Sequence, residues 1–133
     1  MSNWDANIQE LQEKIEYTFK DSTILQRALT AVSYANDHGL KNSEHQEAYS
    51  TLGDAVQDVI VMNQAVLCGR TKKGYVTSSK SIFAEQEAQA QIAKGINLLK
   101  YVRLGGSEVF SIASKVFSRC FESLLGAIFI DGI

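Results

Sequence analysis

The sequence predicts an all-α fold made of one domain. Hydrophobic residues recur every three or four positions in successive segments, which is the spacing of one face of a helix. The 133 residues contain no proline and are 45% hydrophobic and 21% charged, which is typical of a compact, helix-rich domain. The length suits a single core without disulfides. We therefore expect residues 1–133 to form one helical domain with no sheet.

The first half of the chain predicts three helices. Residues 5–19 carry apolar side chains at helical spacing. Asp21 can cap a second helix that runs to about residue 34, and a polar, glycine-containing break follows it. Residues 43–68 form the longest helical candidate, and its broad apolar face predicts a buried centre.

The second half predicts two more helices. Thr77 or Ser78 can cap a helix that runs to Lys94, with Gly95 as its C-cap. Apolar residues recur again with helical spacing from residue 111 to the chain end. The sequence therefore predicts successive helices along the whole chain, with no intervening strand.

Charge limits the kinds of partner that the chain can bind. A formal charge of −2 argues against a surface that attracts nucleic acid everywhere, so any RNA binding must be local. The candidate RNA-binding residues are the cations of one polar stretch, Arg70, Lys72, Lys73 and Lys80. The alternative is that these cations belong to an ordinary solvated loop.

Cysteine usage and the N-terminus indicate an intracellular protein. Cys68 and Cys120 are far apart and have no zinc-binding spacing, so we expect both to be reduced. No basic start precedes an apolar run, and no stretch approaches the roughly 20 apolar residues of a membrane span. We expect a cytoplasmic or nuclear location and no membrane partner.

Four segments, in order along the chain, carry a family resemblance. The most specific is residues 45–56, His-Gln-Glu-Ala-Tyr-Ser-Thr-Leu-Gly-Asp-Ala-Val. It resembles the signature of ribonuclease III domains, glutamate-x-leucine-glutamate-phenylalanine-leucine-glycine-aspartate-alanine. Residues 15–34, 74–77 and 121–132 are similar to that family's opening turn and helix, middle turn and closing helix. The resemblance implies a single ribonuclease III domain, without a double-stranded-RNA-binding domain after it.

The resemblance also identifies the positions of the catalytic carboxylates. The family cuts double-stranded RNA with Mg²⁺, which prefers carboxylate oxygens and water as ligands. Its two ligand positions on the signature helix correspond to Ser50 and Asp54, and its two on the closing helix to Arg119 and Glu122. Two of the four positions have therefore lost a carboxylate. Arginine offers only hydrogen-bond donors, so we expect it to pair with Asp54 or Glu122 instead of binding metal.

Three further residues bear on the same site. Glu47 retains the leading glutamate of the signature, whereas Lys73 replaces an acidic residue found in some relatives. Asp58 follows Asp54 by four positions and lies on the same helical face, where it is either a substitute metal ligand or an ordinary surface residue. We expect no bound metal, and Mg²⁺ only if the site is active.

The family forms two-fold dimers through its signature helix. That precedent places Ala48, Tyr49, Leu52 and Val56 in a dimer seam, although the sequence equally allows them to belong to the intramolecular core. The partner is either a second copy of this chain or another ribonuclease III domain.

Two functions follow from the resemblance. The first is a catalytically degenerate dimeric module, a pseudoenzyme that binds duplex RNA weakly or acts as a scaffold in RNA processing or ribosome assembly. The alternative is an active double-stranded-RNA endoribonuclease whose rearranged site uses Glu47, Asp54, Asp58 and Glu122.

Overall fold

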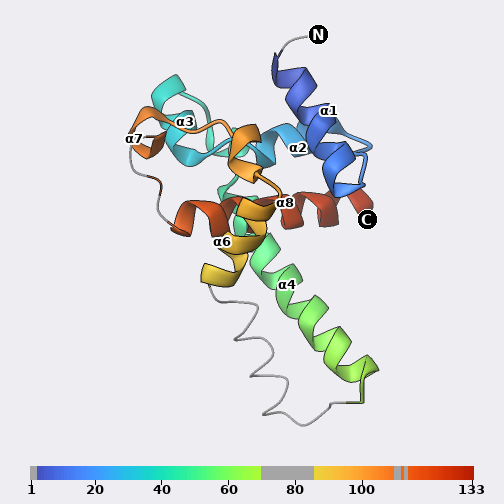
Figure 1. Ribbon diagram of the computed structural model, residues 1–133. Coiled ribbons are helices and arrows are strands. Elements are labelled where there is room, and N and C mark those ends of the chain that lie inside the picture. Colours follow the sequence, from blue (N-terminus) through green and yellow to red (C-terminus); the bar gives the residue numbers. More distant parts are fainter. Residues whose placement is uncertain (1–2, 70–85, 110–111, 113) are drawn as a thin grey trace.

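The computed structural model is all-helical, as the periodicity predicts (Figure 1). It describes residues 3–69, 86–109, 112 and 114–133. Within these residues the one β pairing is an isolated parallel bridge between Thr30 and Arg103. No helix in this part of the chain is both long and apolar enough to cross a membrane.

Two long helices organise the molecule. Helix α8 (Ser114–Gly132) runs through its centre, and α4 (Glu47–Leu67) crosses it and then projects away from the body (Figure 1). Helices α2 and α6 also pack on α8. The core therefore surrounds α8, and its fully buried aliphatic and aromatic side chains include Leu11, Leu25, Leu29, Leu98, Tyr101 and Val116.

The first helix ends earlier than the periodicity predicts. Helix α1 spans Asn3–Ile15, because Glu16 adopts a left-handed backbone conformation with φ of 56°. The chain then turns, and the Phe19 N–H donates to Gln12 Oε1 at 2.7 Å. Phe19 is buried as predicted, but it reaches the core from an extended segment rather than from a helix.

The expected second helix is two helices, α2 (Ser22–Ala28) and α3 (Val32–His38). The predicted cap is confirmed, since Asp21 Oδ1 accepts from the Thr23 N–H at 3.0 Å. The predicted continuity is wrong. Between the helices the backbone pairs with Arg103, whose N–H donates to the Leu29 carbonyl at 2.7 Å and whose carbonyl accepts from the Ala31 N–H at 3.0 Å.

The remaining elements agree with the expected order and add three short ones. A 3₁₀ turn, η1 (Asn42–Glu44), precedes α4, and η2 (Leu98–Tyr101) and α7 (Gly106–Val109) separate α6 from α8. Helix α6 is described over Gln86–Gly95, and the proposed Thr77 or Ser78 cap lies outside the described residues. The left-handed residue after α6 is Asn97, with φ of 53°, and not Gly95.

The C-terminal end of α8 is anchored to the turn after α1. Asp131 is buried and accepts three hydrogen bonds, from the Tyr17 hydroxyl at 2.7 Å and from the backbone N–H groups of Lys20 and Asp21 at 2.9 and 3.0 Å. Burial alone would raise the pKa of this carboxyl, but these hydrogen bonds hold the pKa below its usual value. These hydrogen bonds join the last turn of α8 to the segment between α1 and α2.

Candidate functional site: the crossing of α4 and α8

Two glycines let α4 and α8 touch backbone to backbone. A Cβ atom on Gly53 would lie 1.7 Å from the Glu122 carbonyl oxygen, and one on Gly126 would lie 2.2 Å from the Tyr49 carbonyl oxygen. No side chain fits in either place, so both positions require glycine. This close approach brings the residue after Gly53, Asp54, beside Glu122.

Asp54 and Glu122 form a carboxyl pair at the crossing. Asp54 is exposed and Glu122 is half-buried. Burial, a hydrogen bond with Asp54 and repulsion from its charge raise the pKa of Glu122 to about 7. The pair is therefore able to hold a proton near neutral pH.

Ser50 and Arg119, the two positions at which the family resemblance implies a lost carboxylate, precede Asp54 and Glu122 by about one helical turn on α4 and α8. The Ser50 hydroxyl donates to the backbone carbonyl of Arg119 at 2.9 Å, which links α4 to α8. The Arg119 guanidinium does not pair with Asp54 or Glu122, and that expectation is wrong. Its Nη2 instead forms an ion pair with Glu108 Oε2 at 2.7 Å, because α7 brings that carboxylate to the other side of α8.

Glu108, Ser33 and Gln46 complete the surroundings of Arg119, and sequence analysis had missed all three. Ser33 Oγ donates to Glu108 Oε1 at 2.5 Å, and Arg119 Nε donates to Gln46 Oε1 at 3.3 Å. The one available signal was Arg119 itself, since a partly buried cation needs an acceptor. Its partner was not predictable, because no helix was predicted between Gly95 and residue 111, where α7 lies.

The other predicted site residues are not all brought together. Glu47 is exposed at the start of α4, and Asp58 is half-buried and already has an interaction partner. The candidate RNA-binding cations Arg70, Lys72, Lys73 and Lys80 lie outside the described residues.

The donors at the crossing do not fit the family's four-carboxylate magnesium site. Mg²⁺ requires near-octahedral oxygen coordination. Of the four corresponding positions only Asp54 and Glu122 are acidic, and the Ser50 hydroxyl is already directed to a carbonyl. No group of three or more His, Cys, Asp or Glu suited to a metal occurs within the described part of the chain.

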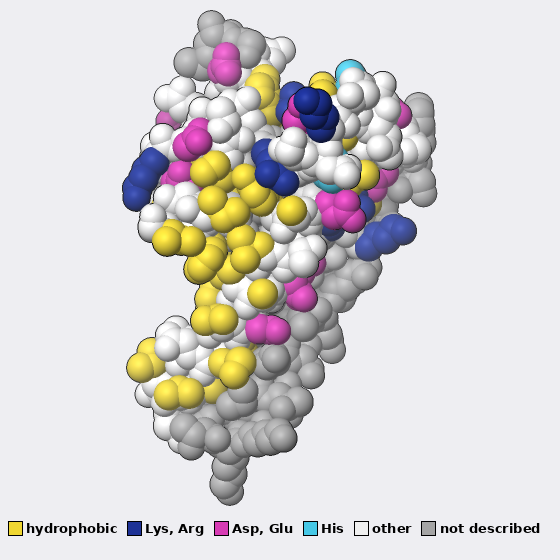
Figure 2. Space-filling view, turned by 180° about the vertical axis from the view of Figure 1, so that it is seen from behind, with side chains coloured by type: hydrophobic (Ala, Val, Ile, Leu, Met, Phe, Trp, Pro, Cys, Tyr) yellow, Lys and Arg dark blue, Asp and Glu magenta, His cyan; other side chains and the backbone are white. Residues whose placement is uncertain are grey.

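An open apolar groove lies beside the crossing. It has a volume of about 420 Å³, and residues of α4 and α8 line it: Leu52, Ala55, Val56, Val59, Ile60, Leu125, Ile128 and Phe129. Hydrophobic side chains gather on the face seen from behind the view of Figure 1 (Figure 2). The exposed fractions of Val59 and Phe129 are 66% and 46%, which is unusual for large apolar residues of a monomer.

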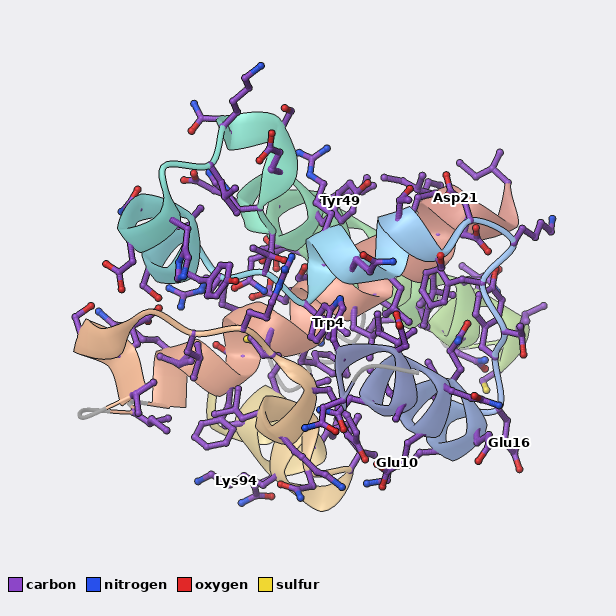
Figure 3. All side chains as sticks on the ribbon, turned by 90° about the horizontal axis from the view of Figure 1, so that it is seen from above. Trp4, Glu10, Glu16, Asp21, Tyr49 and Lys94 are labelled. Carbon is purple, nitrogen blue, oxygen red and sulfur yellow. The ribbon has the colours of Figure 1, made fainter. Side chains whose placement is uncertain are left out.

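The four residues expected in a dimer seam separate into two groups. Leu52 and Val56 line the groove. Tyr49 belongs to the intramolecular core instead, where its ring lies beside α2 and stacks at 4.4 Å on the Arg27 guanidinium (Figure 3). Ala48 is exposed and does not line the groove.

Comparison with known proteins identifies relatives along the whole described fold. A model of the family described as "Ribonuclease-III-like" matches residues 21–133. The protein named Ribonuclease 3 of Oleidesulfovibrio alaskensis is 35% identical over 128 residues, which cover 93% of this chain and 56% of that protein. Ribonuclease 3 of Listeria monocytogenes is 30% identical over 135 residues, which cover 98% and 57%. The chain thus spans little more than half the length of these relatives.

Solved structures support the same assignment. Two structures of the nuclease domain of ribonuclease III from Campylobacter jejuni superpose with TM-scores of 0.81 and 0.79, each at 26% identity. They cover 93% and 98% of this chain, which covers 85% of each of them. The order of motifs, the all-α fold and the match of the family model agree, and the chain belongs to the ribonuclease-III-like family.

Proposed function

We propose that this domain is a catalytically degenerate ribonuclease III module that pairs with a second ribonuclease III domain and serves in RNA processing or ribosome assembly. The observation that carries the proposal is the position of Arg119. It replaces a carboxylate beside Asp54 and Glu122, and its guanidinium is engaged by Glu108. A site with two acids in place of four is a poor magnesium site.

Pairing with a second domain is supported by the apolar groove and by similarity. The description of one of the Campylobacter jejuni structures mentions structural flexibility in a region involved in dimer formation. The groove in this chain offers an apolar surface made by two rigid helices, which suits burial against a similar surface.

Duplex RNA is the proposed ligand because relatives at 30–35% identity are named Ribonuclease 3. Binding should be weak and salt-sensitive. The pair of Asp54 and Glu122 repels phosphates unless a cation lies between them, and the formal charge of the chain is −2. A domain that acts as a scaffold within a larger RNA-containing assembly requires a lower affinity for RNA than a domain that must bind RNA by itself.

A cleavage assay tests the proposal. Purified protein with excess Mg²⁺ should leave long duplex RNA intact while retarding it weakly at low salt. The matched control is Asp54→Asn, which removes a surviving acid of the site. Cutting by the parent that disappears in Asp54→Asn would instead establish the alternative, an active endoribonuclease with a rearranged carboxylate site.

A further inference from the structure

A polar network on one side of α8 surrounds the ion pair of Arg119 and Glu108. Both carboxylate oxygens of Glu108 are occupied, Oε1 by the Ser33 hydroxyl and Oε2 by Arg119 Nη2. The pair is largely shielded from solvent, since the side chains of Arg119 and Glu108 are 29% and 19% exposed. Solvent therefore screens it less than an ordinary surface pair.

Ser33 and Gly105 position the Glu108 carboxylate independently of Arg119. Ser33 Oγ accepts from the Gly105 N–H at 2.9 Å, so its own proton is directed to Glu108. Gly105 is required for the approach, because a Cβ there would lie 2.5 Å from the Ser33 carbonyl. Burial would raise the pKa of Glu108, but the hydrogen bonds from Ser33 and Arg119 hold it below its usual value. The carboxylate is thus ionised at neutral pH.

Glu122, on the same helix, is an alternative ion-pair partner for Arg119. Glu122 follows it by three positions on α8, and side chains with this spacing are close enough to pair. Asp54 lies next to Glu122 and adds to the attraction. A guanidinium that nothing else held would be drawn to these acids, as the sequence alone suggested.

We infer that Glu108 is a positioning residue, which holds the Arg119 guanidinium on the α3 and α7 side of α8 and so keeps it from pairing with Asp54 and Glu122. Arg119 also does not act as a phosphate-binding cation while this pair is intact. The inference is independent of whether the domain binds RNA.

A double-mutant cycle between Arg119 and Glu122 tests this directly. Melting temperatures are measured at pH 8.5 for Arg119→Met, Glu122→Gln and their combination, first in the parent and then in a Glu108→Gln background. In the parent the two shifts should add, because the side chains do not interact. In the Glu108→Gln background they should deviate from additivity by about 3–5 °C, because the released guanidinium pairs with Glu122.

This readout separates positioning from plain stabilisation. A Glu108 that only stabilises the fold would lower the melting temperature without creating coupling between Arg119 and Glu122. Additive shifts in both backgrounds, or coupling already present in the parent, would overturn the inference. Glu10→Gln is the matched control, since Glu10 pairs with the remote Lys100 and its loss should leave the cycle additive.

A milder variant covers the case in which Glu108→Gln does not fold. Ser33→Ala removes the hydroxyl that holds Glu108 Oε1 and keeps the charge of the carboxylate. The same cycle in this background should show coupling smaller than in Glu108→Gln but above the parent. Additive shifts in Ser33→Ala would then count against the inference.

Discussion

Glu122 lies half-buried at the crossing of α4 and α8, and its environment favours the neutral acid. Burial, the hydrogen bond with Asp54 and the charge of Asp54 raise its pKa from 4.5 to about 7. Between these two values the folded chain binds a proton that the unfolded chain has lost. The stability from this group is therefore complete below pH 4.5 and is lost as the pH rises through about 7.

This ionisation predicts a pH-dependent stability. Because solvent screens the half-exposed carboxyl, we expect the parent to lose about 1–2 kcal/mol more than Glu122→Gln between pH 5.5 and 8.5. Urea unfolding at several pH values measures the difference. The glutamine keeps the shape and a hydrogen bond but cannot ionise, so parallel pH profiles for the two proteins would contradict the prediction.

Any attempt to restore a four-carboxylate metal site must replace Arg119, and this removes the ion-pair partner of Glu108. Ser50→Glu with Arg119→Asp restores four acids, but the second change leaves Glu108 without its cation and adds a like charge near it. We therefore expect the triple variant that also carries Glu108→Gln to gain thermal stability on addition of Mg²⁺. Calorimetry with and without Mg²⁺ checks this, and the double variant serves as the comparison. A triple variant indifferent to Mg²⁺ would show that these positions are not a latent metal site.

At the scale of elements, the glycine contacts between α4 and α8 decide the geometry of the site. The Asp54–Glu122 pair exists because the two backbones meet at Gly53 and Gly126 with no side chain between them. A larger residue would separate the helices and with them the acids, since packed interiors tolerate little added volume.

Gly53→Ala should therefore destabilise the protein strongly. Its Cβ would overlap the Glu122 carbonyl, which is rigid helix backbone, and we expect a loss of about 3 kcal/mol or more. Gly95→Ala is the control, because a Cβ there meets no atom within 4 Å and alanine favours helix. Chemical denaturation of both variants measures the contrast. Similar stability of Gly53→Ala and the parent would mean that the helices do not cross this closely.

At the scale of the molecule, the groove of α4 and α8 is an apolar surface that stays open among the described residues. One stripe of α4, formed by Tyr49, Gly53, Gln57, Val61 and Ala65, is buried. The polar Gln57 is accommodated within it because Gln89 Nε2 donates to its Oε1 at 2.7 Å. The predicted buried centre of α4 is thus confirmed for this stripe, whereas Val59 and Ile60 of the same broad apolar face are exposed and line the groove.

If the groove is the proposed dimer seam, Val56→Asp should weaken the dimer without unfolding the domain. An unpaired charge placed in a desolvated seam should raise the dissociation constant by about 100-fold or more. Ile92→Asp is the matched control, because Ile92 is 46% exposed on α6 and does not line the groove. Equilibrium sedimentation compares them. A parent that stays monomeric at micromolar concentration, or equal effects of the two changes, would exclude the groove as the seam.

Local sequence was sufficient for much of the fold. Helical periodicity predicted the all-α class, α4 and α8, and Asp21 was recognised as a cap because capping depends on near neighbours in the chain. The four candidate positions Ser50, Asp54, Arg119 and Glu122 are what the family resemblance implies, and they stay a prediction.

Tertiary structure alone decided what depends on distant segments. The break between α2 and α3 arises because Arg103, more than 70 residues along the chain, pairs with the backbone there. The partner of Arg119 was decided by α7, whose carboxylate outcompetes the acids that sequence spacing favoured. Which face of α4 is covered was decided by where α6 and α8 pack. Periodicity reports which residues share a helix face, but only the packing of other helices determines which of those faces meets protein and which stays open.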